Sequence, residues 1–148
     1  MSDQPSETIP RGLLDTSVVV SLDRVTPGQL PAEPAIAAMT LAELAAGPHA
    51  TDDEIERARR QDRLQRVEAL LEPLPFDAAA ARAYGRIYAA TRARRRKPRG
   101  ARAVDLMIAA VALAHDLPLF TCNPDAFEHL DETGLHLQIV ERTEFARP

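Results

Sequence analysis

Cysteine, aromatic residues and long apolar runs are scarce in this chain of 148 residues. The single cysteine, Cys122, excludes an intrachain disulfide and fits a reducing compartment. No run of about 18 apolar residues occurs, so we expect no membrane-spanning helix. The opening residues MSDQPSETIPRG contain neither the basic nor the apolar region of a signal peptide, and we therefore expect a cytoplasmic protein.

A strong excess of either charge is also missing, as is tryptophan. The net charge of -4 argues against a protein that binds polyanions over its whole surface. Hydrophobic residues still make up 45% of the chain, which is enough for one core. We expect residues 1–148 to form a single domain, with 1–10 as a flexible N-terminal segment.

Short apolar runs alternate with longer helical patterns along the chain. Strands are expected at residues 12–15, 35–39, 117–122 and 136–141, with a short extended segment from Pro73 to Phe76. Helices are expected directly after the first strand, at 40–47, 51–71, 77–96 and 102–115, and as a turn at DAFEHL. This alternation predicts an α/β fold, a three-layer α/β/α domain with a mainly parallel central sheet.

Two of these helices carry further local predictions. Thr51 and Glu54 have the spacing of a capping box at the start of the helix 51–71. In the helix 77–96, the residues at core spacing are Ala81, Tyr84, Ile87 and Tyr88. Tyr84 and Tyr88 are expected to serve in core or dimer packing rather than in base stacking. The KPRG segment at 97–100 ends this helix.

One carboxylate interrupts the apolar run VDLMIAAVALA at residues 104–114. On a helix, the neighbours of Asp105 three, four and seven positions on are Ile108, Ala109 and Ala112. A carboxylate on such a face is unfavourable unless something satisfies its charge. Asp105 therefore needs a partner.

Four acids are predicted at the carboxyl ends of the strands, or on helices that can face them. They are Asp15, Glu43, Asp105 and Asp125. Three of them have a local alternative, since Asp15 can cap a helix, Thr40 and Glu43 have capping-box spacing, and Asn123-Pro124-Asp125 resembles a helix start. Clustered carboxylates repel one another, and a divalent cation removes that conflict.

Oxygen ligands alone favour Mg²⁺ or Mn²⁺ over Zn²⁺. The histidines show no zinc-site spacing and are expected to be surface or structural residues: His49, His115, His129 and His136. Mg²⁺ held by carboxylates is typical of enzymes that catalyse phosphoryl transfer, and a phosphodiester is the natural substrate of such a site.

Four segments carry a family resemblance across about residues 11–142: LLDTSVVV, TLAELAAG, RAVDLMIAAVALAHDLPLFTCNPDAF and HLQIVE. In this order and spacing they resemble the PIN domain and, within it, the VapC toxins of bacterial VapBC toxin–antitoxin systems. The ending with Thr121, Asn123, Asp125 and Phe127 (TxNxDxF) is the most telling part, and the region 48–71 is the least similar to the family.

The resemblance implies a metal-dependent endoribonuclease toxin. Such a toxin hydrolyses phosphodiester bonds in transfer or ribosomal RNA and inhibits translation until a cognate VapB-like antitoxin neutralises it. A homodimer is also implied. By the same resemblance, Asp15, Glu43 and Asp105 match the core metal ligands, and Asp125 matches a fourth acid.

Polar residues around these acids match family positions that orient the carboxylates: Ser17, Thr121 and Asn123. Local turn and cap bonding is an equally open interpretation for Ser17 and Asn123, and for Thr16.

The segment TRARRRKPRGAR, at residues 91–102, is strongly basic. It is interpreted either as a solvated helix end or as a strip that contacts RNA phosphates, and we favour the second. The residues concerned are Arg92, Arg94, Arg95, Arg96, Lys97, Arg99 and Arg102.

A non-catalytic RNA- or protein-binding module on the same fold is the main alternative function. Such a module would be expected to lack at least one of the four acids, and all are present. A metal-dependent phosphatase is disfavoured because Thr16 and Ser17, rather than a second Asp, follow Asp15.

Overall fold

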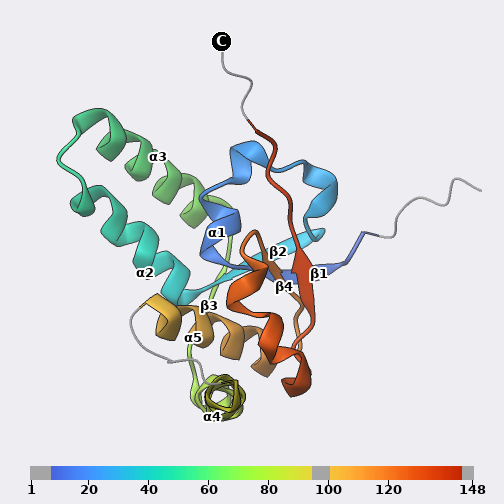
Figure 1. Ribbon diagram of the computed structural model, residues 1–148. Helices are drawn as coiled ribbons and strands as arrows, with labels where there is room; N and C mark the ends of the chain where they lie inside the picture. The colour runs from blue at the N-terminus through green and yellow to red at the C-terminus, as the bar shows by residue number, and fades with distance from the viewer. Residues whose placement is uncertain (1–7, 95–100, 145–148) are drawn as a thin grey trace, which may run out of the picture.

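Five short strands form one parallel sheet in the computed structural model, which describes residues 8–94 and 101–144. The strands are β1 (Arg11–Leu14), β2 (Glu33–Ala37), β3 (Pro73–Leu74), β4 (Leu119–Thr121) and β5 (Leu137–Ile139). Their order across the sheet is β3-β2-β1-β4-β5, and each neighbouring pair is parallel (Figure 1). The predicted α/β fold with a parallel sheet is confirmed.

The strand order fixes where a ligand site is expected. The chain steps outward from β1 to β2 and β3, and then returns to the other side of β1 for β4 and β5. The direction of the winding therefore reverses between β1 and β4. In open parallel sheets, ligands bind beyond the carboxyl ends of the strands at such a reversal.

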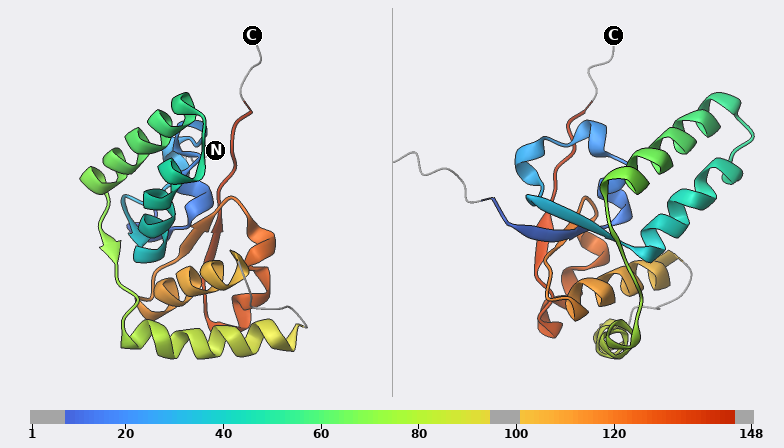
Figure 2. Two further views of the ribbon diagram at one scale, coloured as in Figure 1. Left: turned by 90° about the vertical axis from the view of Figure 1, so that its left-hand side faces the viewer. Right: turned by 180° about the vertical axis from the view of Figure 1, so that it is seen from behind.

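Helices cover both faces of the sheet. They are α1 (Thr16–Val19), α2 (Ala38–Ala46), α3 (Glu54–Leu70), α4 (Ala78–Ala93) and α5 (Ala101–Ala114). Short 3₁₀ turns lie at Leu22–Arg24, Pro27–Gln29, Gly47–Ala50, Pro124–Ala126 (η4) and Glu128–Thr133 (η5). The two views in Figure 2 place α4 and α5 on one side of the sheet and α1 to α3 on the other, as the predicted three layers require.

Alternate residues of β1 feed two separate cores. Leu13 is fully buried in a cluster with Ile87 of α4 and Ile108 of α5. Leu14 points to the other face, where it joins Val18 of α1 and Val67 of α3. Because successive side chains of a strand point to opposite faces, a continuous apolar run is what a doubly covered strand needs.

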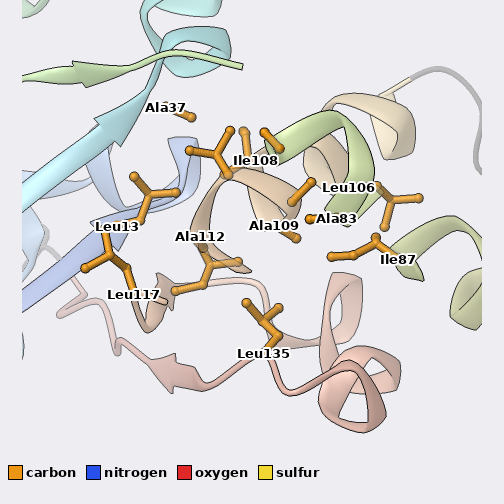
Figure 3. Packing of buried hydrophobic residues seen from close by; sticks show 14 of the residues in the cluster. Leu13, Ala37, Ala83, Ile87, Leu106, Ile108, Ala109, Ala112, Leu117 and Leu135 are labelled. Carbon is orange, nitrogen blue, oxygen red and sulfur yellow. The ribbon is translucent and has the colours of Figure 1, made fainter. Parts of the chain in front are cut away.

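Small side chains let the helices of the larger core approach one another closely. Ala83 of α4 and Ala109 and Ala112 of α5 are buried, and Figure 3 shows them among larger aliphatic residues. The abundance of alanine in the sequence thus serves the packing of α4 and α5 on the sheet.

The boundary between the second strand and its helix lies earlier than predicted. β2 ends at Ala37 and α2 begins at Ala38, so Ala38 and Met39 are helical rather than extended. Thr40 is consequently buried inside the helix and does not cap it. This excludes the local interpretation of Thr40 and Glu43 as a capping box.

The predicted capping box at the start of α3 is wrong. The N-cap is Asp53, whose carboxylate accepts hydrogen bonds from the backbone N–H groups of Ile55 and Glu56. Thr51 instead accepts a hydrogen bond from the N–H of Asp53, which positions the cap. Two hydroxyl or carboxylate residues near one helix start compete for the same donors, and the residue next to the helix prevails here.

The core-facing stripe of α4 differs in part from the predicted one. Ala81 and Tyr88 are exposed, and the buried residues are Ala80, Ala83, Ile87 and Thr91. The helix ends at Ala93 rather than at residue 96. The last residues of the predicted helix and the KPRG break at 97–100 lie outside the described residues.

The positions of the four histidines agree with the predicted surface or structural roles. His129 is buried and shares a 2.9 Å hydrogen bond with the Thr91 hydroxyl of α4, while the other three histidines are exposed. Within residues 8–94 and 101–144, no helix has both the length and the apolar character needed to cross a membrane.

Candidate active site

Asp15 directly follows β1 and is 97% shielded from solvent, with a relative exposure of 3%. Its carboxylate accepts hydrogen bonds from the hydroxyl groups of Ser17 at 2.5 Å and Thr121 at 2.6 Å, and from the N–H of Val18 at 3.2 Å. The last of these bonds makes Asp15 the N-cap of α1 as well. Burial raises the pKa of Asp15, and the hydrogen bonds oppose that rise.

The hydroxyl groups that hold Asp15 also join the ends of β1 and β4. The hydroxyl of Ser17 accepts a hydrogen bond from the N–H of Cys122, and that of Thr121 accepts one from the N–H of Asn123. Each hydroxyl therefore donates to Asp15 while accepting from the chain after β4. This arrangement fixes both oxygens of the Asp15 carboxylate at the reversal of the sheet.

Glu43 approaches the same region from α2. Its side chain is exposed, and Oε1 accepts a 2.7 Å hydrogen bond from the hydroxyl of Thr16. The same hydroxyl lies 3.1 Å from that of the buried Thr40. Residues adjacent to Asp15 therefore position the second acid too.

Asp105 lies in the first part of α5 and is half-buried. Burial, followed by the negative charges of Asp15 and Glu43, raises the pKa of Asp105 to about 6, while the charge of Arg102 acts in the opposite direction. Like charges act on a carboxyl in this way when they lie near it. The structure thus brings together three of the four predicted acids.

Asp125 belongs to a neighbouring cavity rather than to the immediate group of three. It is exposed in η4, as is the Asn123 side chain that precedes this turn. A cavity of about 270 Å³ is lined by Arg102, Asp105, Asn123, Asp125 and Ala126. Asp105 is therefore the residue that joins the cavity to the other two acids.

The chemistry of these donors fits a hard divalent cation. All the donors are carboxylate oxygens, and the like charges that raise the pKa of Asp105 are what a cation would offset. Among the residues that the structure describes, no three acidic, histidine or cysteine side chains converge closely enough to hold an ion in their present rotamers. Glu43, for example, is turned onto Thr16.

The structure describes three of the seven predicted RNA-contacting residues. Arg92 and Arg94 are exposed at the end of α4, and Arg94 forms a 2.8 Å ion pair with Glu132. Arg102 lies apart from them, in the cavity beside Asp105. The other four, Arg95, Arg96, Lys97 and Arg99, lie outside the described residues.

The tyrosines of α4 form part of a small aromatic group. The ring of Tyr84 lies 6.4 Å from that of Phe76 and 6.1 Å from that of Tyr88, between centroids. Tyr84 is half-buried against the larger core, whereas Tyr88 is 39% exposed.

Arginines of α3 were not foreseen near the site. Arg60 and Arg63 line a cavity together with Thr16 and Glu43. Nothing in the amphipathic pattern of α3 distinguishes these two from its other arginines, and only the angle between α2 and α3 brings them there.

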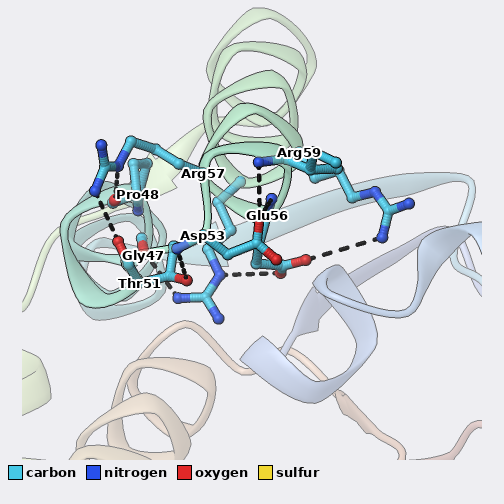
Figure 4. A network of polar contacts seen from close by, with 9 residues as sticks. Gly47, Pro48, Thr51, Asp53, Glu56, Arg57 and Arg59 are labelled. Carbon is cyan, nitrogen blue, oxygen red and sulfur yellow. Dashed lines mark hydrogen bonds and ion pairs between the residues drawn. The ribbon is translucent and has the colours of Figure 1, made fainter.

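Polar contacts to backbone carbonyl groups set that angle (Figure 4). Arg57 donates to the carbonyl groups of Pro48 and Thr51, and Arg60 donates to that of Gly47 and to Glu56. These bonds tie α3 to the turn after α2, and so help to position the helix that carries Glu43.

Comparisons with known proteins agree on one family. Residues 13–133 match the PIN domain. Ribonuclease VapC5 of Mycobacterium tuberculosis is 38% identical over 131 residues, which cover 85% of this chain and 92% of that protein. The structure resembles that of VapBC-5, a member of the VapBC family of toxin–antitoxin systems from the same organism, with a TM-score of 0.75 and 34% identity over 88% of this chain and 98% of that one.

More distant matches share the fold. The structure of FitAcB from Neisseria gonorrhoeae matches with a TM-score of 0.67 and 25% identity, over 84% of this chain and 94% of that one. VapBC2 from Rickettsia felis, bound to a promoter DNA fragment, matches with a TM-score of 0.70 at 22% identity, over 88% of this chain and 99% of that one.

Proposed function

Since this chain belongs to the PIN-domain family, as a ribonuclease of its VapC branch, we propose that it is a Mg²⁺-dependent endoribonuclease toxin of a VapBC toxin–antitoxin pair. It hydrolyses phosphodiester bonds in transfer or ribosomal RNA and so inhibits translation. The matched family region spans the whole candidate site, from Leu13 to Thr133.

The grouping of three acids is the observation that supports a metal-dependent reaction. Asp15, Glu43 and Asp105 come from three separate elements, and their charges interact at the reversal point of the parallel sheet. Capping of α1 accounts for an acid at Asp15, but nothing in the packing of the core requires Asp105 near it, and repulsion between like charges opposes folding. An arrangement that is unfavourable for folding is expected where it serves a ligand.

Asp15, Glu43 and Asp105 would hold the cation, with Asp125 contributing from the adjoining cavity. Mg²⁺, or Mn²⁺ in its place, supplies Lewis-acid activation of water and offsets the charge that develops on the phosphate oxygens.

The chain's own residues prepare the acids for that role. Ser17 and Thr121 donate to Asp15, which favours its ionised form against the effect of burial and fixes its orientation. Thr16 restrains Glu43 in the same manner. The Asp105 carboxyl, with a pKa of about 6, is mostly ionised at neutral pH and loses its remaining proton when a cation binds.

RNA would approach from the side of the basic segment 91–102. Arg92, Arg94 and Arg102, together with the basic residues at 95–99, would contact its phosphates. We further propose that the toxin forms a homodimer, that a VapB-like antitoxin neutralises it, and that it acts in the cytoplasm. The structural matches to VapBC proteins support the antitoxin partner.

Sequencing of RNA 5′ ends after induction tests the proposal. Expression of the wild type should create new 5′ ends in a small set of RNAs, and the Asp105→Asn variant should create none. Asp116→Asn is a matched control, because Asp116 lies just beyond the other end of α5 with a φ of 53°, which Asn adopts readily. New 5′ ends that persist in Asp105→Asn would instead indicate a binding module or a different set of acids.

A further inference from the structure

The cavity beside Asp105 contains a cationic side chain whose hydrogen bonding is incomplete. One terminal guanidinium nitrogen of Arg102, Nη1, is buried and has no hydrogen-bond partner among the residues that the structure describes. Buried donors in folded proteins are nearly always paired, since an unpaired one has given up its water and received nothing in return. Nη1 of Arg102 therefore needs a hydrogen-bond acceptor, and the described residues do not supply one.

The nearby carboxylates do not serve as that acceptor. Arg102 and Asp105 are three residues apart on α5 and line the same cavity. Even so, no ion pair within 4 Å joins Arg102 to an acid in the described part of the chain. An arginine free to move would be expected to pair with a carboxylate so close to it. Its guanidinium group is instead held apart from Asp105.

The residues that line the cavity indicate which kind of ligand would supply this acceptor. Among its five lining residues, Arg102 provides the positive charge, Asn123 a neutral amide, and Asp105 and Asp125 negative charges. A phosphodiester entering beside Asp105 is repelled by these acids. The Arg102 guanidinium offers parallel N–H donors that match two phosphate oxygens. Because Nη1 is buried, the side chain would turn into the cavity to make this contact, which would give Nη1 its acceptor.

We propose that the guanidinium group of Arg102 binds a phosphate of the RNA strand within this cavity, immediately beside the carboxylates. This inference rests on the proposed function, because it takes RNA as the ligand. It separates Arg102 from the other basic residues of the segment 91–102. Arg92, for example, is exposed on α4 outside this cavity, where solvent and salt weaken its contact with a phosphate.

Binding of a fluorescein-labelled single-stranded RNA, followed by anisotropy in the presence of Mg²⁺, tests this role. All proteins carry Asp15→Asn, so that binding is measured without cleavage, and Asp15 does not line the cavity. Arg102→Met should reduce affinity about tenfold, as expected for loss of a charge-assisted contact. The matched control Arg92→Met removes the same charge outside the cavity and should reduce affinity less than about threefold.

Arg102→Lys distinguishes the guanidinium fork from its charge. Lysine should keep the salt dependence of binding, because it neutralises the same phosphate, and still lose part of the affinity. The melting temperature of Arg102→Met should stay close to that of its parent, because removal of the buried unpaired donor offsets the loss of attraction between Arg102 and Asp105.

Four outcomes overturn the inference. They are unchanged RNA affinity in Arg102→Met, equal losses for Arg92→Met and Arg102→Met, a lower melting temperature that accounts for the loss, and loss of antitoxin binding with RNA binding intact. A parent protein that binds no RNA overturns the proposed function as well. A parent that binds RNA equally well with and without Arg102 overturns this inference alone.

Discussion

Ionisation of Asp105 favours cation binding but lowers the stability of the folded protein. Burial and the charges of Asp15 and Glu43 raise its pKa from 3.8 to about 6. Between these two values the folded protein binds more protons than the unfolded chain does, so the free energy of unfolding falls as the pH rises. The ionised carboxylate that a cation requires is therefore the form that destabilises the metal-free protein.

This conflict predicts how stability depends on pH. In the presence of EDTA, the melting temperature of the wild type should fall as the pH rises from about 4 to about 6. Asp105→Asn should reduce that slope, leaving the part that comes from the raised pKa of Asp15. It should also raise the free energy of unfolding at pH 7 by about 1 kcal/mol, after allowance for the solvent that the side chain still contacts. Thermal unfolding over a pH series measures both effects.

The control for this experiment is Asp116→Asn, an exposed acid outside the site. It should leave the slope unchanged. A wild-type slope of the opposite sign in this interval, or one that Asp105→Asn does not alter, would contradict the assignment of the shifted group.

The sequence predicts the four acids as one group, whereas the hydrogen bonds around them come from the structure. Asp105 stands out because three apolar residues share its helix face. Ser17 and Thr121 could be assigned by family resemblance, yet only the structure shows that each hydroxyl donates to Asp15 while accepting from the chain after β4. Hydroxyl groups form many local bonds, and sequence does not reveal which bond prevails.

At the scale of single elements, the second position of β1 favours glycine because it lies against the ring of Phe120. A Cβ built on Gly12 would lie 2.3 Å from Cε1 and 2.8 Å from Cδ1 of Phe120 in the neighbouring strand β4. Gly12→Ala should therefore lower the free energy of unfolding by about 1–3 kcal/mol, measured by urea denaturation.

Gly85 provides the matched comparison within α4. A Cβ there would meet no atom within 4 Å, and the residue is exposed in a helix interior. Gly85→Ala should raise the free energy of unfolding by about 0.5–1 kcal/mol, because alanine loses less backbone freedom on folding. Equal effects of the two substitutions would show that the contact with Phe120 is relieved at little cost.

The N-terminus of α3 depends on a single carboxylate. Asp53→Ala removes the acceptor for the N–H groups of Ile55 and Glu56 and should destabilise the protein by about 1 kcal/mol in urea denaturation. Asp52→Ala removes the same charge one residue earlier, where the side chain is exposed and is not the cap. A similar loss in both variants would assign the effect to the helix dipole rather than to the cap.

Element types were predictable and element boundaries were not. The apolar run of β1 and the amphipathic pattern of α4 identify a strand and a helix correctly. The passage from β2 to α2 falls in a run of alanine and methionine that suits either state, so tertiary contacts place it at Ala38. The stripe of α4 is displaced because alanine on both sides of the helix leaves the core-facing side undefined.

At the scale of the whole molecule, the sheet topology brings acids from separate elements into one region. Each acid follows from its own element, with Asp15 at the end of β1, Glu43 in α2 and Asp105 in α5. The parallel order brings the carboxyl ends of β1 and β4 together, and α2 and α5 deliver the remaining acids. The fold class predicts that Asp15 lies at this edge and allows the helical acids to face it, whereas the place of Asp125 in a neighbouring cavity depends on the geometry of η4.

A site made by the whole fold should link cation binding to global stability. An ion that binds only the folded protein adds about 2.7 kcal/mol to the free energy of unfolding at a hundred times its Kd. Mg²⁺ should therefore raise the melting temperature of the wild type at pH 7.5, and EDTA should reverse the change.

The acids should differ in how far they support this linkage. Asp105→Asn should abolish the Mg²⁺-dependent rise, because its carboxylate is the one whose charge is coupled to both Asp15 and Glu43. Asp125→Asn should reduce the rise without removing it, since Asp125 meets the group only through the cavity that Asp105 shares. The measurement is the shift in melting temperature across a Mg²⁺ titration, with Asp116→Asn as the unaffected control. If Asp125→Asn removes the shift and Asp105→Asn leaves it intact, the cation binds in the cavity and not among the three acids at the sheet.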